Sequence, residues 1–73
     1  MIDVLIADDS PTSLSYIKEL LSIDEEFRIV AQAKNGIDAV RLAQETRPNV
    51  IVMDLFMPGL DGFEATQEIM RTT

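Results

Sequence analysis

An apolar run that ends in a single carboxylate constrains the fold of this chain more than any other stretch. Residues 50–53 read Val-Ile-Val-Met, Asp54 follows, and Pro58 and Gly59 interrupt any regular structure soon after. Short β-branched runs between turn signals are typical of strands buried on both faces, in parallel sheets covered by helices. Ligands of such open sheets bind just beyond the carboxyl ends of the strands. We therefore predict a buried strand at residues 50–54 and a functional site at Asp54.

The rest of the chain predicts two more strands and three helices. Hydrophobic periodicity indicates strands at residues 2–7 and 27–33, and helices at residues 11–22, at residues 37–47 and from about residue 63. Ser10 and Pro11 have the residue types of a helix start, and Pro48 is expected to stop the second helix. The order βαβαβα predicts an α/β fold with a three-stranded parallel sheet and right-handed crossovers.

Helical spacing also predicts which side chains are buried. The second helix is expected to bury Ile37 and Val40, with Ala43 as a further candidate. The third is expected to carry Phe63, Thr66, Ile69 and Met70 on one side. Methionines are expected to fill the core. The Asn35-Gly36 pair predicts a turn in which positive φ is readily adopted.

Composition restricts the classes of partner. The 73 residues allow one small domain, residues 1–73, and a net charge of −7 argues against nucleic acid or anionic membrane as the main partner. No apolar run approaches the roughly 20 residues of a membrane helix. The chain has no Cys, which suits a reducing compartment, and its start does not resemble a signal peptide, so a cytoplasmic location is expected. With no His, the chain cannot carry a phosphohistidine.

Carboxylates follow two of the three predicted strands. Asp8 and Asp9 end the first strand and Asp54 ends the third, so the three acids meet if these strands are neighbours. Their mutual repulsion either raises their pKa values or is relieved by a bound cation, and oxygen ligands at an open site suit Mg²⁺. A carboxylate beside such a metal can act as a nucleophile toward phosphorus. Two simpler interpretations stay open: Asp9 serves only the helix N-terminus, and Asp54 only caps a loop.

The combined motifs resemble the receiver domain of two-component response regulators. The resemblance is carried by Asp8-Asp9-Ser10, by Asp54 and by two longer stretches, Ala33-Lys34-Asn35-Gly36-Ile37-Asp38-Ala39 and Met57-Pro58-Gly59-Leu60-Asp61-Gly62. It covers the whole chain. Ile69-Met70-Arg71 and the long connection over residues 22–28 are most similar to the receiver of chemotaxis protein-glutamate methylesterases.

The resemblance implies a role for each matching residue. Asp54 would be the phosphoacceptor nucleophile, and Asp8, Asp9, Asp54 and the backbone carbonyl of Phe56 would hold Mg²⁺. The phosphoryl donor would be a phosphohistidine on a sensor histidine kinase. The module would not itself be an enzyme, although a parent protein could carry a separate methylesterase effector domain.

The length of the chain departs from the family pattern. Receiver domains have a flavodoxin-like, doubly wound fold with five strands in the order 2-1-3-4-5. The resemblance therefore implies that this chain corresponds to the N-terminal half of such a domain, with strand order 2-1-3. The family's hydroxyl residue after strand four and lysine after strand five have no counterpart here. We therefore expect phosphorylation to be impaired in a chain of this length. The alternative is a catalytically idle half-receiver that acts as a folding or self-assembly scaffold.

Two further enzyme classes are less compatible with the residues. A phosphohydrolase with an Asp nucleophile usually has a second acid two residues later, where this chain has Phe56. A dinucleotide-binding domain is not expected, because no Gly-x-Gly-x-x-Gly follows a strand.

The short chain also predicts a surface for self-association. Without a fourth strand, residues 50–53 would form an open hydrophobic sheet edge, which invites pairing with another chain. We expect a homodimer through the strand from Val50 to Asp54, with a two-fold axis and a six-stranded sheet.

Overall fold

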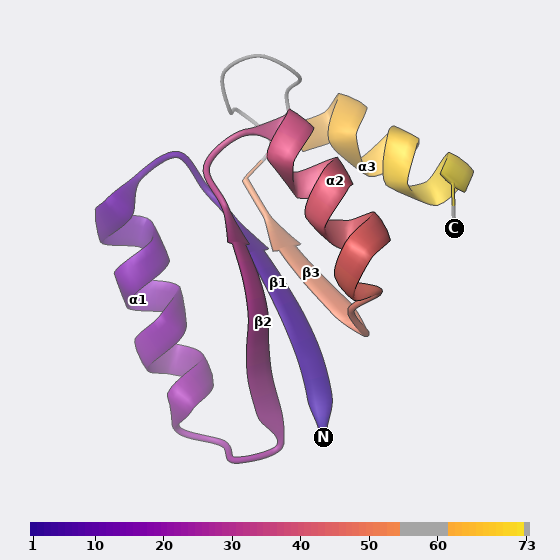
Figure 1. Ribbon diagram of the computed structural model, residues 1–73. Coiled ribbons are helices and arrows are strands. Elements are labelled where there is room, and N and C mark those ends of the chain that lie inside the picture. Colours follow the sequence, from indigo (N-terminus) through magenta and orange to yellow (C-terminus); the bar gives the residue numbers. More distant parts are fainter. Residues whose placement is uncertain (55–61, 73) are drawn as a thin grey trace.

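The structure is a computed structural model that describes residues 1–54 and 62–72, and Figure 1 shows its arrangement. The elements in chain order are β1 (Ile2–Ala7), α1 (Pro11–Ser22), β2 (Phe27–Ala33), α2 (Gly36–Thr46), β3 (Val50–Met53) and α3 (Gly62–Thr72). This order confirms the predicted βαβαβα pattern. Among the described residues no helix is long and apolar enough to cross a membrane.

The three strands form one parallel sheet in the order β2-β1-β3, as predicted. Ala7, the last residue of β1, pairs with Ala33 at the end of β2 and with Met53 at the end of β3. The carboxyl ends of all three strands therefore lie level at one edge of the sheet. Figure 1 shows α1 separated from α2 and α3 by the sheet.

The central strand β1 is buried on both faces. Val4 and Ile6 pack with Leu14 of α1, and Leu5 and Ala7 pack on the opposite face, where α2 and α3 lie. Side chains of a strand alternate between its faces, so one strand anchors both helical layers. All four of these β1 side chains are at most 1% exposed, as expected for the central strand of a parallel sheet.

Side-chain caps start the first two helices. The Ser10 hydroxyl accepts a hydrogen bond from the Ser13 N–H, which confirms the predicted helix start. The Asn35 side-chain oxygen accepts from the Asp38 N–H at 2.8 Å and caps α2. The chain bends at residues 34 and 35, where a turn was predicted, but Asn35 itself is extended, with φ of −153°. An extended conformation is what an N-cap needs to aim its side chain at the first turn.

The second helix ends one residue earlier than predicted. Arg47 takes a left-handed conformation, with φ of 47°, and its N–H donates to the Ala43 carbonyl at 2.9 Å. Proline disfavours the helical conformation of the residue before it, and Pro48 follows here. The left-handed cap both stops α2 and turns the chain into β3.

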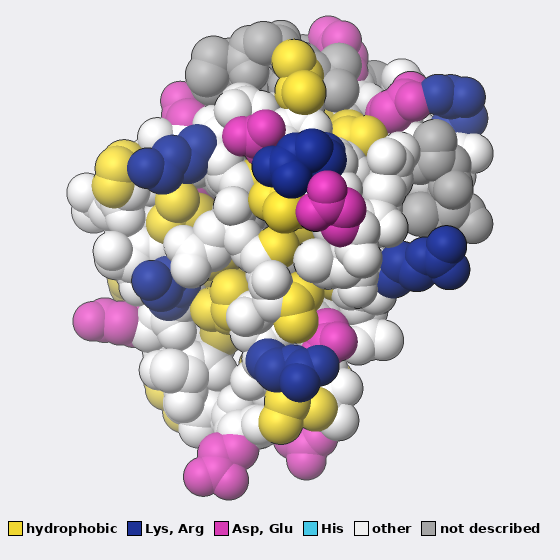
Figure 2. All heavy atoms as spheres, in the orientation of Figure 1, with side chains coloured by type: hydrophobic (Ala, Val, Ile, Leu, Met, Phe, Trp, Pro, Cys, Tyr) yellow, Lys and Arg dark blue, Asp and Glu magenta, His cyan; other side chains and the backbone are white. Residues whose placement is uncertain are grey.

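Several expected burial positions were wrong. Val50 and Val52 are 42% and 37% exposed, so β3 is covered on one face only, and it ends at Met53 rather than Asp54. Ile37 and Met70 are also exposed. The expected burial of Ala43 and Ile69 is confirmed, and the other buried side chains of α2 and α3 are the small Ala39 and Ala65. Small side chains allow these helices to approach the sheet and each other closely. Hydrophobic side chains are visible among the charged ones in the space-filling view (Figure 2).

A polar cluster ties the three strands together at the amino end of the sheet. The Arg28 guanidinium of β2 donates two hydrogen bonds to the Asp3 carboxylate of β1, at 3.0 and 3.1 Å. Asn49, just before β3, accepts from the Asp3 N–H and donates its own N–H to the Asp3 carbonyl. The cluster fixes the strand register at the end opposite the three acids.

The two-sided burial of β1 predicts that truncation there is costly. Leu5→Ala removes a side chain that is fully buried against α2 and α3, and should lower the free energy of unfolding by about 2–5 kcal/mol. Urea unfolding followed by circular dichroism would measure this. The control Leu20→Ala, on the exposed side of α1, should cost less than about 1 kcal/mol. Equal losses for the two variants would contradict the packing described.

Candidate functional site

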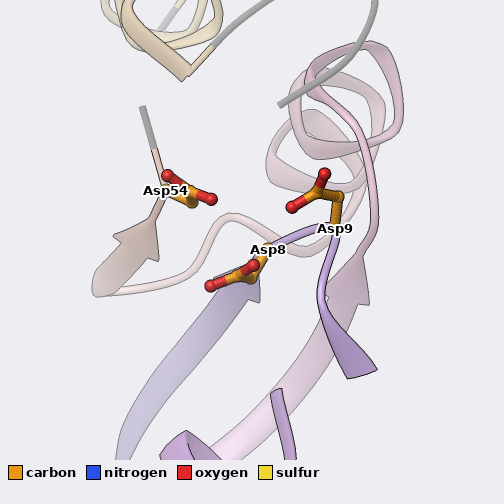
Figure 3. Close-up of side chains that lie close together, drawn as sticks. All are labelled: Asp8, Asp9 and Asp54. Atoms are coloured by element: carbon orange, nitrogen blue, oxygen red, sulfur yellow. The ribbon is translucent and has the colours of Figure 1, made fainter. Parts of the chain in front are cut away.

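The three predicted acids lie together at the carboxyl edge of the sheet. Asp8 and Asp9 follow β1, Asp54 follows β3, and Figure 3 shows their side chains converging on one small region. One carboxylate oxygen from each lies within 4.8 Å of the others. The neighbouring positions of β1 and β3 bring these residues together although 45 positions separate Asp9 from Asp54 in the sequence.

Backbone hydrogen bonds continue past the strand ends and fix two of the acids. The Asp8 N–H donates to the Ala33 carbonyl of β2 at 3.0 Å, and the Asp54 N–H donates to the Ala7 carbonyl of β1 at 2.9 Å. These bonds extend the parallel pairing by one residue on each side of β1. The two carboxylates are therefore held by the most buried part of the fold rather than by a free loop.

Ser10 orients the Asp8 side chain, a role that the sequence analysis missed. The Ser10 N–H donates to Asp8 Oδ1 at 3.0 Å, while the Ser10 hydroxyl caps α1. An Asp side chain that accepts from the backbone two residues later is a known turn signal, so the Asp-Asp-Ser stretch could have indicated it. Ser10 thus connects the start of α1 to the position of one acid.

The burial of the site suits binding of a small cation or a phosphoryl group. Asp8 and Asp54 are half-buried and Asp9 is exposed, so the cluster is open to solvent on one side. The donor set consists of carboxylate oxygens, which Mg²⁺ prefers, and a half-buried carboxylate remains accessible to an incoming reactant. Phe56, whose carbonyl was predicted to complete the site, lies outside the described residues.

A hollow in the described part of the chain lies away from the three acids. It has a volume of about 600 Å³ and opens among α2, β3 and α3, lined by Ala43, Gln44, Arg47, Pro48, Asn49, Ile51 and Ile69. None of the three acids lines it. This hollow is therefore separate from the carboxylate cluster.

Over nearly the whole chain, sequence comparison identifies the family that the sequence motifs resemble. The model of the response regulator receiver domain matches residues 4–73. A protein-glutamate methylesterase/protein-glutamine glutaminase of Methanospirillum hungatei is 44% identical over 73 residues, all of this chain but 21% of that protein. Protein PilH of Pseudomonas aeruginosa is 41% identical over 97% of this chain and 57% of its own length. The chain thus spans about a fifth of its methylesterase relative.

Structural comparison agrees with the sequence comparison. The response regulator domain of Thermotoga maritima CheB superposes with a TM-score of 0.94 and 39% identity, over 97% of this chain and 53% of that one. A CheX–CheY–BeF3–Mg²⁺ complex from Borrelia burgdorferi gives a TM-score of 0.89 and 30% identity, over 97% of this chain and 54% of the matched one. Both similarities cover nearly the whole of this chain.

The geometry of the acids predicts that Mg²⁺ stabilises the fold. A ligand that binds only the folded state adds RT ln(1 + [L]/Kd), which is about 1.4 kcal/mol at ten times Kd. We expect the melting temperature to rise with Mg²⁺, and Asp9→Asn to reduce this response. Glu25→Gln removes one exposed negative charge at the opposite end of α1 and should leave it unchanged. An equal response in both variants would show non-specific screening instead of binding.

Proposed function

The chain belongs to the response regulator receiver domain family, and from this premise we propose that it is a phosphoacceptor module of chemotaxis-type two-component signalling. Asp54 accepts the phosphoryl group in this proposal. The observation that carries it is the convergence of Asp8, Asp9 and Asp54 within 4.8 Å at the carboxyl edge of a receiver fold. The donor is a phosphohistidine of a sensor histidine kinase.

The transfer requires one new bond at Asp54. A carboxylate oxygen of Asp54 attacks phosphorus and forms an O–P bond, while the N–P bond of the phosphohistidine breaks. Its electron pair returns to the imidazole nitrogen of the kinase, which takes a proton from solvent. The chain contributes position to this step: the Asp54 N–H is bonded to the Ala7 carbonyl, so the carboxylate is held at the end of β3.

The acids fit a Mg²⁺ ion. One carboxylate oxygen of each acid lies within 4.8 Å of the others, and carboxylate oxygens are ligands that Mg²⁺ prefers. Asp8, Asp9 and Asp54 would hold it, and the Phe56 carbonyl remains part of the proposal. When bound, the ion supplies positive charge that offsets the negative charge of the phosphoryl oxygens. Ser10 keeps the Asp8 carboxylate turned toward the cluster.

The share of each relative that this chain covers is relevant to the domain organisation of the whole protein. The chain covers 53% of the matched CheB domain and 21% of a methylesterase, which supports the proposal that residues 1–73 are the N-terminal half of a receiver. We propose that methylesterase activity belongs to a separate effector domain of a longer protein, and that such a protein works in the cytoplasm. The net charge of −7 favours protein partners over nucleic acid.

The proposal predicts that phosphorylation depends on Asp54. Incubation with a phosphorylated sensor kinase and Mg²⁺ should add one phosphoryl group, detected by intact-mass spectrometry and released by hydroxylamine. Asp54→Asn should abolish the addition because the amide is not a nucleophile, and the matched variant Asp24→Asn, in the loop after α1, should retain it.

Two other outcomes would redirect the interpretation. Binding of Mg²⁺ without beryllofluoride or phosphoryl uptake would favour the idle scaffold, since the acids would then hold a cation without chemistry. Steady hydrolysis of a phosphate ester would favour a phosphohydrolase.

A further inference from the structure

The connection from β2 to α2 contains an asparagine followed directly by a glycine, Asn35 and Gly36. Glycine has no Cβ, so its backbone can approach other groups closely. In such a pair the glycine nitrogen can reach the side-chain amide carbon of the asparagine and close a five-membered ring. The other asparagine of the chain, Asn49, precedes the β-branched Val50, whose side chain hinders the same approach.

We propose that Asn35 is a self-modification site, at which the backbone nitrogen of Gly36 displaces the side-chain amide of Asn35, and that the cap of α2 suppresses this reaction in the folded chain. The site is formed by α2 and the connection that precedes it. It is independent of phosphoryl transfer at Asp54, and its only co-reactant is water.

The reaction passes through a cyclic intermediate. The Gly36 nitrogen loses its proton to solvent and attacks Cγ of Asn35, so that an N–C bond forms and the bond from Cγ to Nδ2 breaks. Nδ2 takes a proton and leaves as ammonia, and the chain retains a succinimide ring. Water then adds to one of the two ring carbonyls and breaks its bond to nitrogen. Opening at Cγ gives aspartate, and opening at the main-chain carbonyl gives isoaspartate, whose backbone is longer by a methylene group.

The native backbone of Asn35 keeps the reacting atoms apart. A five-membered ring is almost flat, so ring closure requires the Cα–Cβ bond to be nearly eclipsed with the bond from the carbonyl carbon to the Gly36 nitrogen. Asn35 has ψ of 167°, and at this angle the two bonds are staggered. Gly36 is buried at the start of α2, which restricts rotation of the peptide group that would have to turn.

The side chain of Asn35 is also held away from the reactive position, at both of its polar atoms. Oδ1 accepts from the Asp38 N–H at 2.8 Å, and Nδ2 donates to Asp38 Oδ2 at 3.1 Å. The Asn35 carbonyl accepts from the Ala39 N–H at 3.0 Å. The reaction therefore requires the first turn of α2 to open. Its rate in the folded chain is the rate of the open form multiplied by the fraction of molecules in which this turn is open.

The two products differ in their effect on α2. Aspartate is as good an N-cap as asparagine, although it lacks the Nδ2 donor and places a second carboxylate beside Asp38. Isoaspartate lengthens the backbone at the cap, and the first turn then cannot keep its position relative to Ala39 and Ala43, which are buried in the core. Isoaspartate is therefore the damaging product.

Incubation of the full chain at mildly alkaline pH tests the proposal, with one sample folded in buffer and one unfolded in guanidinium chloride. Peptide mapping by mass spectrometry measures the conversion of each asparagine. In the unfolded chain Asn35 should convert to the acid products, whereas Asn49 should stay unchanged over the same time. In the folded chain the Asn35 rate should fall about tenfold or more, because the turn is open in only a small fraction of molecules.

Two variants of α2 separate the cap from general effects. Asp38→Ala removes the acceptor of Asn35 Nδ2 and should raise the folded rate about threefold or more, without changing the unfolded rate. Glu45→Ala removes the same charge and the other carboxylate partner of Arg41 within α2, and should change the folded rate less than about twofold. Hydrogen exchange of the residue 38 amide, whose acceptor is Asn35 Oδ1, should increase by the same factor as the conversion.

The variant Asn35→Asp supplies the aspartate product directly. It should keep its helix content by circular dichroism, because Asp retains the cap. Loss of helix in this variant, equal Asn35 rates in the folded and unfolded chain, comparable conversion of Asn49, or equal effects of Asp38→Ala and Glu45→Ala would each overturn the proposal.

Discussion

The pairing of β1 with a parallel strand on each side is the constraint on which the rest of this structure depends. It buries Val4, Leu5, Ile6 and Ala7 between two helical layers, and it sets the strand ends level. The hydrophobic effect acts on both faces of this one strand, which carries the largest fully buried side chains among the described residues. Everything beyond the carboxyl ends, including the three acids, is positioned by this sheet.

The site shows how a stable element can hold groups that repel each other. Asp8 and Asp54 follow strands whose backbone hydrogen bonds continue one residue past the sheet, so neither acid can move away without breaking a bond. The Ser10 N–H adds a partner for one carboxylate. Three carboxylates kept this close repel one another, and a bound cation would relieve that repulsion.

The sequence by itself determined the element order and the three candidate acids, because apolar runs, period-3.6 apolar patterns and strand-end carboxylates are local signals. The strand order 2-1-3 followed from the resemblance to receiver domains. Only the tertiary structure decided which apolar residues are covered. Four residues were predicted to lie in the core but are exposed, because burial depends on what packs opposite a residue: Ile37, Met70, Val50 and Val52.

The tertiary structure also decided the backbone conformation of Asn35, which is extended and caps α2 at Gly36. The contact between Asp8 and Asp54 is tertiary too, since a parallel sheet had to bring two distant strand ends side by side.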